Sequence, residues 1–450
     1  MLFAVVKAHF RGAKGTSKGG PVAMAKRSET KSTRRTWLKR AGGATAAGFA
    51  APYVLTSDAL ATPGRPGAND RLYLGHIGIN WMGGDHLKLI VKDSAVRSVA
   101  LCDTDAKLLA DRASWVPGGC ETHRDFRELL DRKDLDAVLV AVPDHWHSLI
   151  SIYACQAGKD VYCEKPLSLT VREGRAMVDN ARRYARIFQV GSQQRTADNF
   201  RRACELVRSG RIGKVHTVEV NVWGTSKPCD LPAESTPDHV DWNMWIGPAP
   251  YRPFNRKIHP VNWRGWRDYA GGTMTDWGAH HLDIAQWGLG MDHTGPVEIH
   301  PPGKDHKGLR YVYANGVTLL CGHVRGRGAK FIGSDGAIEV DRGHLKSWPD
   351  EIIKEPLGRG EVHLRRPAST DVGNPWRRNE LDFFASVKSR QRPLCDVEIG
   401  HRTVTLCHLG NIALWLKRAI KWDPKTERII GDEAASRWLE RPMRAPWHLS

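Results

Sequence analysis

Two short motifs, far apart in the chain, carry side chains that could act on a hydroxyl group. Glu164-Lys165-Pro166 directly follows the apolar run 160–163. A lysine at the end of a buried strand could donate a hydrogen bond to a substrate oxygen and stabilise it as it becomes alkoxide-like, although a pair with the neighbouring Glu164 is the alternative. In Asp276-x-x-x-His280, the imidazole could take a hydroxyl proton near neutral pH, and Asp276 could orient the imidazole or hold a neighbouring hydroxyl. Together the motifs predict acid–base chemistry at a carbinol oxygen.

The second motif lies in a stretch with the spacing of an α-helix, for which Thr275 is the expected N-cap. Positions 276, 280, 283 and 287 would share a polar and aromatic face, and positions 278, 282, 285 and 289 a small and apolar face. We expect the apolar face to pack on the protein and the polar face to look into a cleft. A metal site at positions 276, 280 and 283 is an alternative, but no further ligands can be identified, so no metal is predicted.

A third motif predicts a dinucleotide-binding turn. The sequence Gly78-Ile79-Asn80-Trp81-Met82-Gly83 follows an apolar run and opens a helix in the register G-x-N-x-x-G. In the usual G-x-G-x-x-G, glycines permit the tight turn and let backbone N–H groups reach a pyrophosphate. Asn80 replaces the second glycine, and asparagine tolerates a left-handed backbone better than other residues with a side chain. An ordinary turn between a strand and a helix is the alternative.

Asp103 supports the dinucleotide interpretation. It ends the next predicted strand, 20 residues after Gly83, where a carboxylate can accept hydrogen bonds from both ribose hydroxyls. It would repel a 2′-phosphate and no arginine follows it at once, so we expect NAD rather than NADP. As an alternative or in addition, Asp103 could cap the following helix.

The elements that must position these motifs follow two patterns. Residues 71–190 alternate apolar runs with amphipathic stretches, which is typical of βαβ units on a parallel sheet. Expected strands are 72–79, 98–102, 137–142, 160–163 and 187–190, with helices at 105–113, 126–132, 148–157 and 171–185. Later residues predict a helix at 199–209, a strand at 215–223, a Pro- and Trp-rich stretch, an antiparallel meander over 311–340, and helices at 377–389 and 402–417.

We therefore expect an α/β protein with four parts. These are a signal segment (1–61), a Rossmann dinucleotide-binding domain (71–195), a domain for substrate and oligomerisation (196–420), and a C-terminal tail that packs on the body (421–450).

Residues 1–61 are predicted to be an address rather than a fold. Thr33-Arg34-Arg35 precedes a weakly apolar run and the small-x-small sequence 59–61, as in a twin-arginine signal, and the run is too short and polar for a membrane anchor. The segment holds 11 Lys and Arg against two acidic residues, which is half of the net charge of +18, so no nucleic acid partner is expected. We expect periplasmic export by the twin-arginine machinery with the cofactor already inside. A disordered basic tail is the alternative, and translation could begin at Met1 or Met24.

Together, these residues resemble the glucose-fructose oxidoreductase / inositol dehydrogenase (Gfo/Idh/MocA) family over nearly all of residues 71–450. The family's glycine-rich turn falls on 78–83, its E-K-P on 164–166 and its D-x-x-x-H on 276–280. The resemblance implies that the second domain holds a large, open, mostly antiparallel sheet and that Lys165, Asp276 and His280 are catalytic. It also implies that the segments 143–147 and 189–195 line the cleft.

Cofactor contacts are expected at Gly78, Asn80, Trp81, Met82, Gly83, Asp103, Pro143, His147, Glu164 and Lys165. For His147, capping of the following helix is the alternative. Substrate contacts are expected at Lys165, Arg195, Trp263, Arg264, Asp276, His280 and His281. Tryptophan is frequent between residues 223 and 287, and its faces suit the C–H faces of sugars, although a Trp-rich core or a subunit contact would explain it equally well.

The sequence thus predicts an NAD-dependent oxidoreductase that transfers hydride between a carbinol of a sugar, polyol or glycoside and a tightly held nicotinamide. Because free NAD is not expected outside the cytoplasm, the cofactor would be reset in place. A glycoside-cleaving enzyme that uses transient oxidation and elimination is one alternative, and a non-catalytic sugar-binding protein is the other. By analogy with the family, we expect a homo-oligomer.

Overall fold

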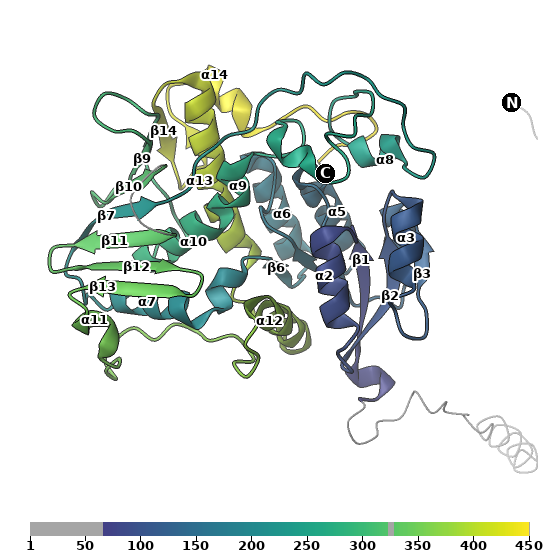
Figure 1. Ribbon diagram of the computed structural model, residues 1–450, viewed down its shortest axis with the longest axis horizontal. Helices are drawn as coiled ribbons and strands as arrows, with labels where there is room; N and C mark the ends of the chain where they lie inside the picture. The colour runs from purple at the N-terminus through teal and green to yellow at the C-terminus, as the bar shows by residue number, and fades with distance from the viewer. Residues whose placement is uncertain (1–65, 323–327, 450) are drawn as a thin grey trace, which may run out of the picture. The chain divides into compact units, whose positions relative to one another are not determined.

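The computed structural model describes residues 66–322 and 328–449 (Figure 1). The predicted signal segment and the choice between Met1 and Met24 lie outside the described residues. The first element described is a short 3-10 helix, η1 (Ala68–Asp70).

The first sheet is parallel throughout and has the order β3-β2-β1-β4-β5-β6. Its strands are β1 (Leu72–Ile77), β2 (Val96–Cys102), β3 (Glu121–His123), β4 (Ala137–Val140), β5 (Asp160–Cys163) and β6 (Phe188–Val190). The connecting helices are α2 (Trp81–Ile90), α3 (Ala106–Ala113), α4 (Phe126–Leu130), α5 (Asp144–Gln156) and α6 (Val171–Arg183). Strands β4 and β5 are buried along their whole length, as expected where helices cover both faces of a parallel sheet. This is the predicted Rossmann architecture.

The second sheet has nine strands in the order β13-β12-β11-β7-β10-β9-β8-β14-β15. They are β7 (Val215–Val220), β8 (Glu298–His300), β9 (Leu309–Val312), β10 (Thr318–Cys321), β11 (Ala329–Gly333), β12 (Ala337–Asp341), β13 (His344–Trp348), β14 (Ile420–Asp423) and β15 (Arg428–Ile429). The pairing is antiparallel except between β7 and β10. The predicted fold class, a Rossmann domain with a large and mostly antiparallel second sheet, is confirmed.

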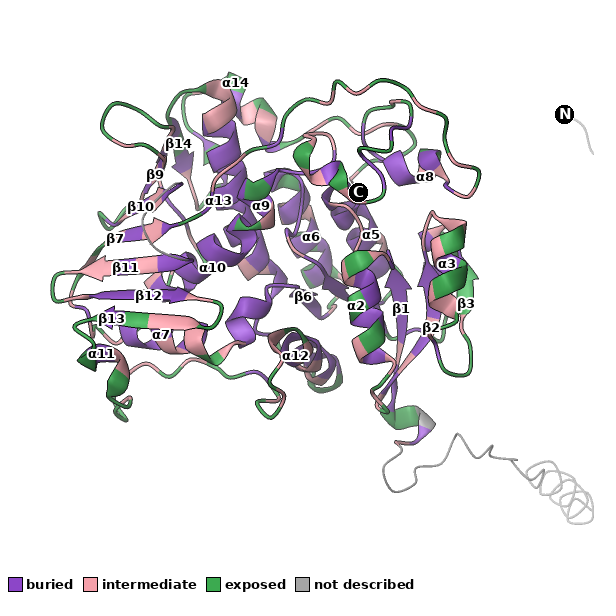
Figure 2. Cartoon of the chain, in the orientation of Figure 1, coloured by how far each residue is buried: buried purple, intermediate pink, exposed green. Residues whose placement is uncertain are grey.

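Helices cover one face of the second sheet, and the core of this domain lies between these helices and the sheet (Figure 2). The covering helices are α7 (Asp198–Arg208), α10 (Gly278–Leu289) and α13 (Val397–Leu416). The remaining helices are η2 (Gln193–Thr196), α8 (Trp242–Ile246), η3 (Asn262–Gly265), α9 (Thr273–Asp276), α11 (Glu351–Lys354), α12 (Pro375–Ser389), α14 (Glu433–Ser436) and η4 (Arg437–Leu439).

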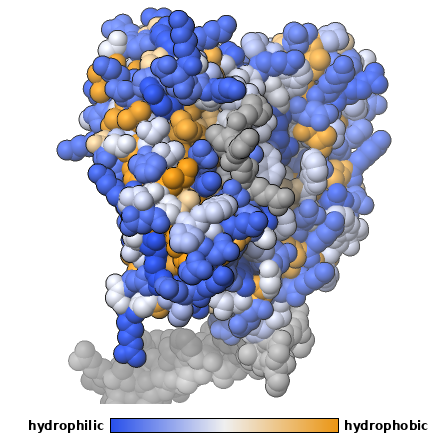
Figure 3. All heavy atoms as spheres, turned by 60° about the vertical axis from the view of Figure 1, so that its left-hand side comes forward, coloured by the Kyte–Doolittle hydropathy of each residue, from blue (hydrophilic) through white to orange (hydrophobic). Residues whose placement is uncertain are grey.

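The surface view in Figure 3 looks from the side of the second sheet. It shows hydrophobic residues in several separate groups among hydrophilic ones. One exposed aromatic residue at the outermost part of this sheet is Trp348, at the end of β13, and the Lys330 ammonium lies 4.6 Å from its ring centre. A homo-oligomer stays a prediction.

The late part of the chain returns to the first domain. Phe383, Phe384 and Val387 of α12 pack in one apolar cluster with residues of β1 and β4. Trp447 lies in the cluster that contains Phe126. Strand β14, at the boundary predicted at residue 420, pairs with β8 in the second sheet. Residues beyond 375 therefore complete the core of the Rossmann domain. The predicted division into consecutive segments assigned these residues to the second domain and to the tail.

Candidate active site

A cleft of about 1180 Å³ opens at the carboxyl edge of the first sheet, where open α/β sheets bind their ligands. Its walls come from the ends of β1, β2, β4 and β5 and from the segment 244–264 of the second domain. Of the expected cofactor and substrate contacts, those that line it are Gly78, Asn80, Trp81, Met82, Asp103, Pro143, Glu164, Lys165, Trp263 and Arg264. The cleft thus joins most of the predicted cofactor residues to Lys165.

The glycine-rich turn is built differently from the sequence expectation. The left-handed residue is Gly78, with φ of +80°, and a Cβ there would lie 2.5 Å from the carbonyl oxygen of Ala141. Asn80 has an extended backbone instead, and its side chain caps α2 by accepting a hydrogen bond from the N–H of Trp81. Gly83 does not line the cleft; a Cβ on it would lie 2.0 Å from the carbonyl oxygen of Gly78. It is needed for the close approach of α2 to the turn.

Asp103 is held at the end of β2 by backbone donors. Its Oδ2 accepts from the N–H of Ile79 and its Oδ1 from the N–H of Asp105, both at 3.0 Å. Burial raises the pKa of this carboxyl, and these hydrogen bonds oppose the rise. The cap of α3 is Asp105 rather than Asp103. The turn at Gly78, the start of α2 and this oriented carboxyl at one end of the cleft fit a dinucleotide.

Lys165 lines the cleft and meets Asp276, which is not among the lining residues, although 111 positions separate them. The Lys165 ammonium donates to Oδ1 of Asp276 at 2.7 Å and to the backbone oxygen of the same residue at 3.1 Å. Arg264 approaches the same Oδ1 at 3.5 Å. Burial alone would raise the pKa of Asp276, but Lys165 and then Arg264 lower it. Asp276 is therefore an anion that fixes the ammonium, which has one more N–H to offer a ligand.

The predicted single helix around His280 is divided into α9 and α10 at Trp277. Thr275 is not its N-cap, because its hydroxyl donates to the carbonyl oxygen of Gly272. The polar and aromatic helix face, which we expected to look into the cleft, is buried towards the C-terminal end of the helix, where Asp283 is 0% and Trp287 is 4% exposed. The helix crosses the protein interior, so only its first turns can reach the site.

His280 lies one turn beyond Asp276, is 3% exposed and is not among the residues that line the cleft. Burial lowers its pKa well below 6.5, and the positive charges of Lys165 and Arg342 add to this. Its Nδ1 has no hydrogen-bond partner among the described residues. His281 stacks on Trp277 at 5.6 Å, also outside the cleft lining, and burial lowers its pKa to about 4. His280 is a neutral imidazole near Lys165, which leaves its predicted role as a base a proposal.

Arg195 lies away from the cleft lining and is 1% exposed. Its guanidinium pairs with both carboxylate oxygens of Asp283 at 2.8 Å and with Asp292 at 2.7 Å. The structure therefore places this predicted substrate contact inside the protein, where it compensates the buried carboxylate of Asp283 and the partly buried carboxylate of Asp292. The sequence around Arg195 did not indicate whether its guanidinium would bind a ligand or pair with a carboxylate inside the protein.

The motif 143–147 contributes one side chain that the sequence analysis did not assign. His145 lies within hydrogen-bond distance of the backbone oxygen of Trp245, and the indole N–H of Trp146 donates to those of Met244 and Trp245. His147 lies between the backbone oxygens of Pro166 and Val142. His147 is thus a buried tie between loops, and it does not line the cleft. Asp144, the first residue of α5, does line it. Burial raises the pKa of Asp144 to about 8.

The Trp-rich stretch folds partly as a core and partly as a wall of the cleft. Trp242 and Trp245 stack at 4.6 Å within a small apolar cluster, and Trp263 lies in this cluster and also lines the cleft. The stretch is joined to the first domain beside Asp103, because the N–H of Ala106 donates to the oxygen of His239 and the N–H of Asp241 to that of Thr104. Trp245 and Trp263 therefore belong both to the small core and to the cleft wall, and whether they contact a substrate stays a prediction.

Glu164 is fixed by a buried histidine on α2. His86 lies 2.9 Å from Glu164 and 2.6 Å from Glu380 of α12. Burial would lower the pKa of His86, but these two carboxylates raise it to about 10. The charged imidazole therefore joins α2, the Lys165 motif and α12 into one unit.

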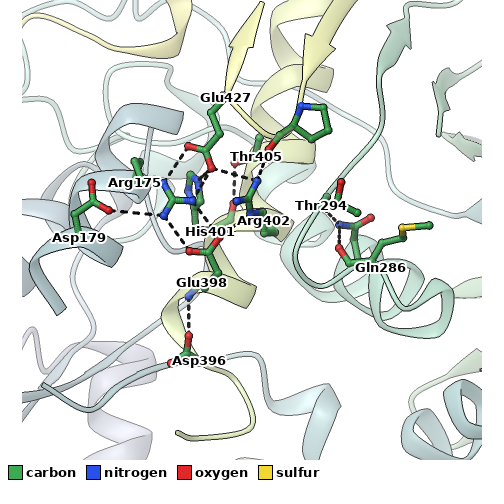
Figure 4. A network of polar contacts seen from close by, with 12 residues as sticks. Arg175, Asp179, Gln286, Thr294, Asp396, Glu398, His401, Arg402, Thr405 and Glu427 are labelled. Carbon is green, nitrogen blue, oxygen red and sulfur yellow. Dashed lines mark hydrogen bonds and ion pairs between the residues drawn. The ribbon is translucent and has the colours of Figure 1, made fainter. Parts of the chain in front are cut away.

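A second polar network holds the helix that follows the Lys165 motif (Figure 4). Arg175 of α6 pairs with Glu398 of α13 at 2.9 Å and with Glu427, next to β15, at 2.5 Å. His401 of α13 lies 2.9 Å from the same Glu427. Helix α6 is thereby tied to α13, the helix that also packs on α10.

In 66–322 and 328–449, no group of three or more His, Cys, Asp or Glu side chains has the arrangement of a metal site. Over the same residues, no helix has the length and apolar character needed to cross a membrane.

Comparison with known proteins agrees with this geometry. Residues 73–192 match the model "Oxidoreductase family, NAD-binding Rossmann fold", and residues 211–350 and 367–449 match "Oxidoreductase family, C-terminal alpha/beta domain", both of the Gfo/Idh/MocA family. Inositol 2-dehydrogenase 2 of Saccharopolyspora erythraea is 34% identical over 224 residues, which are 49% of this chain and 54% of that protein. A glycosyl hydrolase family 109 protein of Shewanella pealeana is 29% identical over 204 residues, 41% of this chain and 44% of that protein.

The matched part thus spans about half the length of these curated relatives. Among solved structures, the aldose-aldose oxidoreductase of Caulobacter crescentus, complexed with glycerol, has a TM-score of 0.56 and is 19% identical, covering 78% of this chain and 99% of that one. At this identity the likeness concerns the fold. The two family models together match most of the chain, and the chain belongs to the Gfo/Idh/MocA family of NAD-binding oxidoreductases.

Proposed function

We propose that the protein transfers hydride between a CH–OH group of a sugar, polyol or glycoside and a tightly held nicotinamide dinucleotide. The observation that carries the proposal is the Lys165–Asp276 pair, because Lys165 lines the same cleft as the glycine-rich turn and Asp103 and Asp276 holds its ammonium from behind the lining. Inositol and sugar dehydrogenases among the related proteins support the substrate class. The bound dinucleotide would supply the hydride acceptor.

The protein groups have separate tasks in this proposal. The Lys165 ammonium donates a hydrogen bond to the carbinol oxygen and stabilises the negative charge that develops there. Asp276 holds the ammonium in place. His280, one turn further along, is the proposed base for the hydroxyl proton, as its motif predicts. Trp263 and Arg264 form the substrate wall.

NAD is proposed over NADP because the carboxylate of Asp103 occupies the ribose end of the cleft. Periplasmic export through the twin-arginine pathway and a homo-oligomeric state belong to the proposal as well. They follow from residues 1–61 and from analogy with the family, respectively.

The proposal is tested by mass spectrometry of nucleotide released from the purified protein, followed by a polyol and glycoside screen that records nicotinamide absorbance. We expect released NAD and an absorbance change with a subset of the carbinols. A protein that is empty and does not bind added NAD would instead be a sugar-binding protein that has lost turnover.

Glycoside cleavage by transient oxidation and elimination is a second candidate, favoured by the family 109 glycosyl hydrolase among the relatives. Its net reaction consumes no NAD. An aryl glycoside should then release its aglycone without added NAD, whereas a simple dehydrogenase would change only the nicotinamide absorbance.

A further inference from the structure

The start of α5 presents a carboxyl to the cleft that the proposed reaction has not used. Asp144 is the first residue of this helix, follows Pro143 at the N-cap, and is 3% exposed. Among the described residues, the hydrogen bond to its carboxyl comes from its own backbone N–H. The three side chains that follow it are engaged with backbone oxygens. Of the ionisable residues 144, 145 and 147 in this turn, only Asp144 lines the cleft.

The charged groups around Asp144 come from three other segments. Lys165 follows β5, Arg264 lies in η3 and Asp276 ends α9; each interacts electrostatically with Asp144. The buried thiol of Cys163 also feels its charge. Asp144 therefore lines the same cleft as Lys165 and Arg264, and it is close enough to both cations and to Asp276 to interact with their charges.

We propose that Asp144 is a second acid–base group of the site, which holds the proton released when the carbinol is oxidised and supplies it in the reverse direction. The inference rests on the proposed function. In oxidation, the O–H bond breaks, the carbon–oxygen double bond forms, and the C–H bond gives its hydrogen with both electrons to the nicotinamide. The remaining proton ends on the Asp144 carboxylate, which becomes a carboxylic acid and then exchanges with water.

Proton affinity favours Asp144 over the other groups near Lys165. Burial raises the pKa of Asp144 to about 8, whereas burial lowers that of His280 well below 6.5 and the cations lower that of Asp276. His259, which also lines the cleft, has its pKa lowered to about 4. An acid–base group works best when its pKa lies near the working pH. Of these groups, Asp144 therefore has the proton affinity best suited to hold the released proton near neutral pH.

The first experiment does not depend on turnover. Infrared spectra of the purified protein and of Asp144→Asn are recorded between pH 5 and 10, and their difference isolates the Asp144 carboxyl. We expect a protonated-carboxyl band that disappears around pH 8 in the wild type and has no counterpart in the variant. A carboxyl that is already ionised at pH 6 would overturn the proposal.

The second experiment is the pH dependence of kcat/KM in the oxidation direction. The wild type should gain activity as the pH rises through about 8, because only the carboxylate of Asp144 can accept the proton. In Asp144→Asn, this rise of kcat/KM near pH 8 (the limb of the pH profile) should disappear, and kcat should fall by about 10²–10⁴-fold. Asp144→Glu should recover part of both, and Asp179→Asn, an exposed carboxyl of α6, should match the wild type.

The two hypotheses fail in different ways. If the protein holds NAD and oxidises a carbinol but Asp144→Asn keeps the limb near pH 8, the role of Asp144 is refuted and the proposed function stands. If neither NAD nor turnover is found, the proposed function fails and this inference fails with it.

Discussion

The start of α5 and the end of α9 each bring one carboxyl to Lys165, but the two regions treat the carboxyl differently. Asp276 makes direct contact with the ammonium and is reached by Arg264, so its pKa is lowered although it is partly buried. Asp144 feels the same cations from a distance and is more deeply buried, so desolvation raises its pKa to about 8. Direct pairing decides the charge of one residue, and burial decides that of the other.

This difference separates two tasks that the same residue type performs. A permanently ionised carboxylate can hold an ammonium in place but is a poor carrier of protons near neutral pH. A carboxyl that titrates in the working range can carry a proton but cannot hold a constant charge. The predictions below change one side of this arrangement at a time.

Replacing His280 by alanine tests whether the α9–α10 side also contributes a base. We expect kcat to fall by about 10²–10⁴, with the content of bound cofactor unchanged, because His280 lies outside the glycine-rich turn. His281→Ala is the matched control, since this neighbouring buried histidine stacks on Trp277 and should cost less. Persistent activity in His280→Ala would leave Asp144 as the base.

Lys165→Met removes the cation that both carboxyls share. We expect a loss of about 10²–10³ in kcat, because the developing oxyanion loses its donor. The pKa of Asp276 should rise more than that of Asp144, since Asp276 is in direct contact with the ammonium. Kinetics and the infrared titration of both carboxyls measure this, with the exposed Lys88→Met as control. Equal shifts at the two carboxyls would contradict the distinction between pairing and burial.

The sequence predicted the motifs that come together at the cleft better than it predicted which side chains around them are buried. The glycine-rich turn, Asp103 and the strands around them follow from local patterns, because the βαβ unit that forms them is nearly continuous in the chain. The motifs placed Lys165, Asp276 and His280 in one catalytic set, but they did not predict the direct contact between Lys165 and Asp276 that the structure has. Burial, in contrast, depends on segments distant in sequence. For that reason Arg195 was expected at the substrate, and Asp144 was not assigned.

Asp276→Asn removes the anion that holds Lys165. A charge-assisted hydrogen bond is worth about 1.5–3 kcal/mol, so we expect kcat/KM to fall by about 10- to 100-fold. Because the charge of Asp276 raises the pKa of Asp144, the limb near pH 8 should also move to lower pH. The pH profile of kcat/KM measures both effects. A limb that moves to higher pH would show that the two carboxyls do not interact as described.

Asp144→Asn changes stability in a way that depends on pH. Between the pKa of an unfolded aspartate, about 3.9, and the folded pKa of about 8, the folded protein binds one more proton than the unfolded chain. The stability of the wild type should therefore fall as the pH rises through this window, by about 1 kcal/mol per pH unit from this residue. Asparagine has no proton to lose, so its advantage in urea unfolding should grow from pH 5 to pH 8 and then level off. Parallel stability curves for the two proteins would mean that Asp144 is ionised in the folded state, and that burial at the start of α5 does not outweigh Lys165 and Arg264.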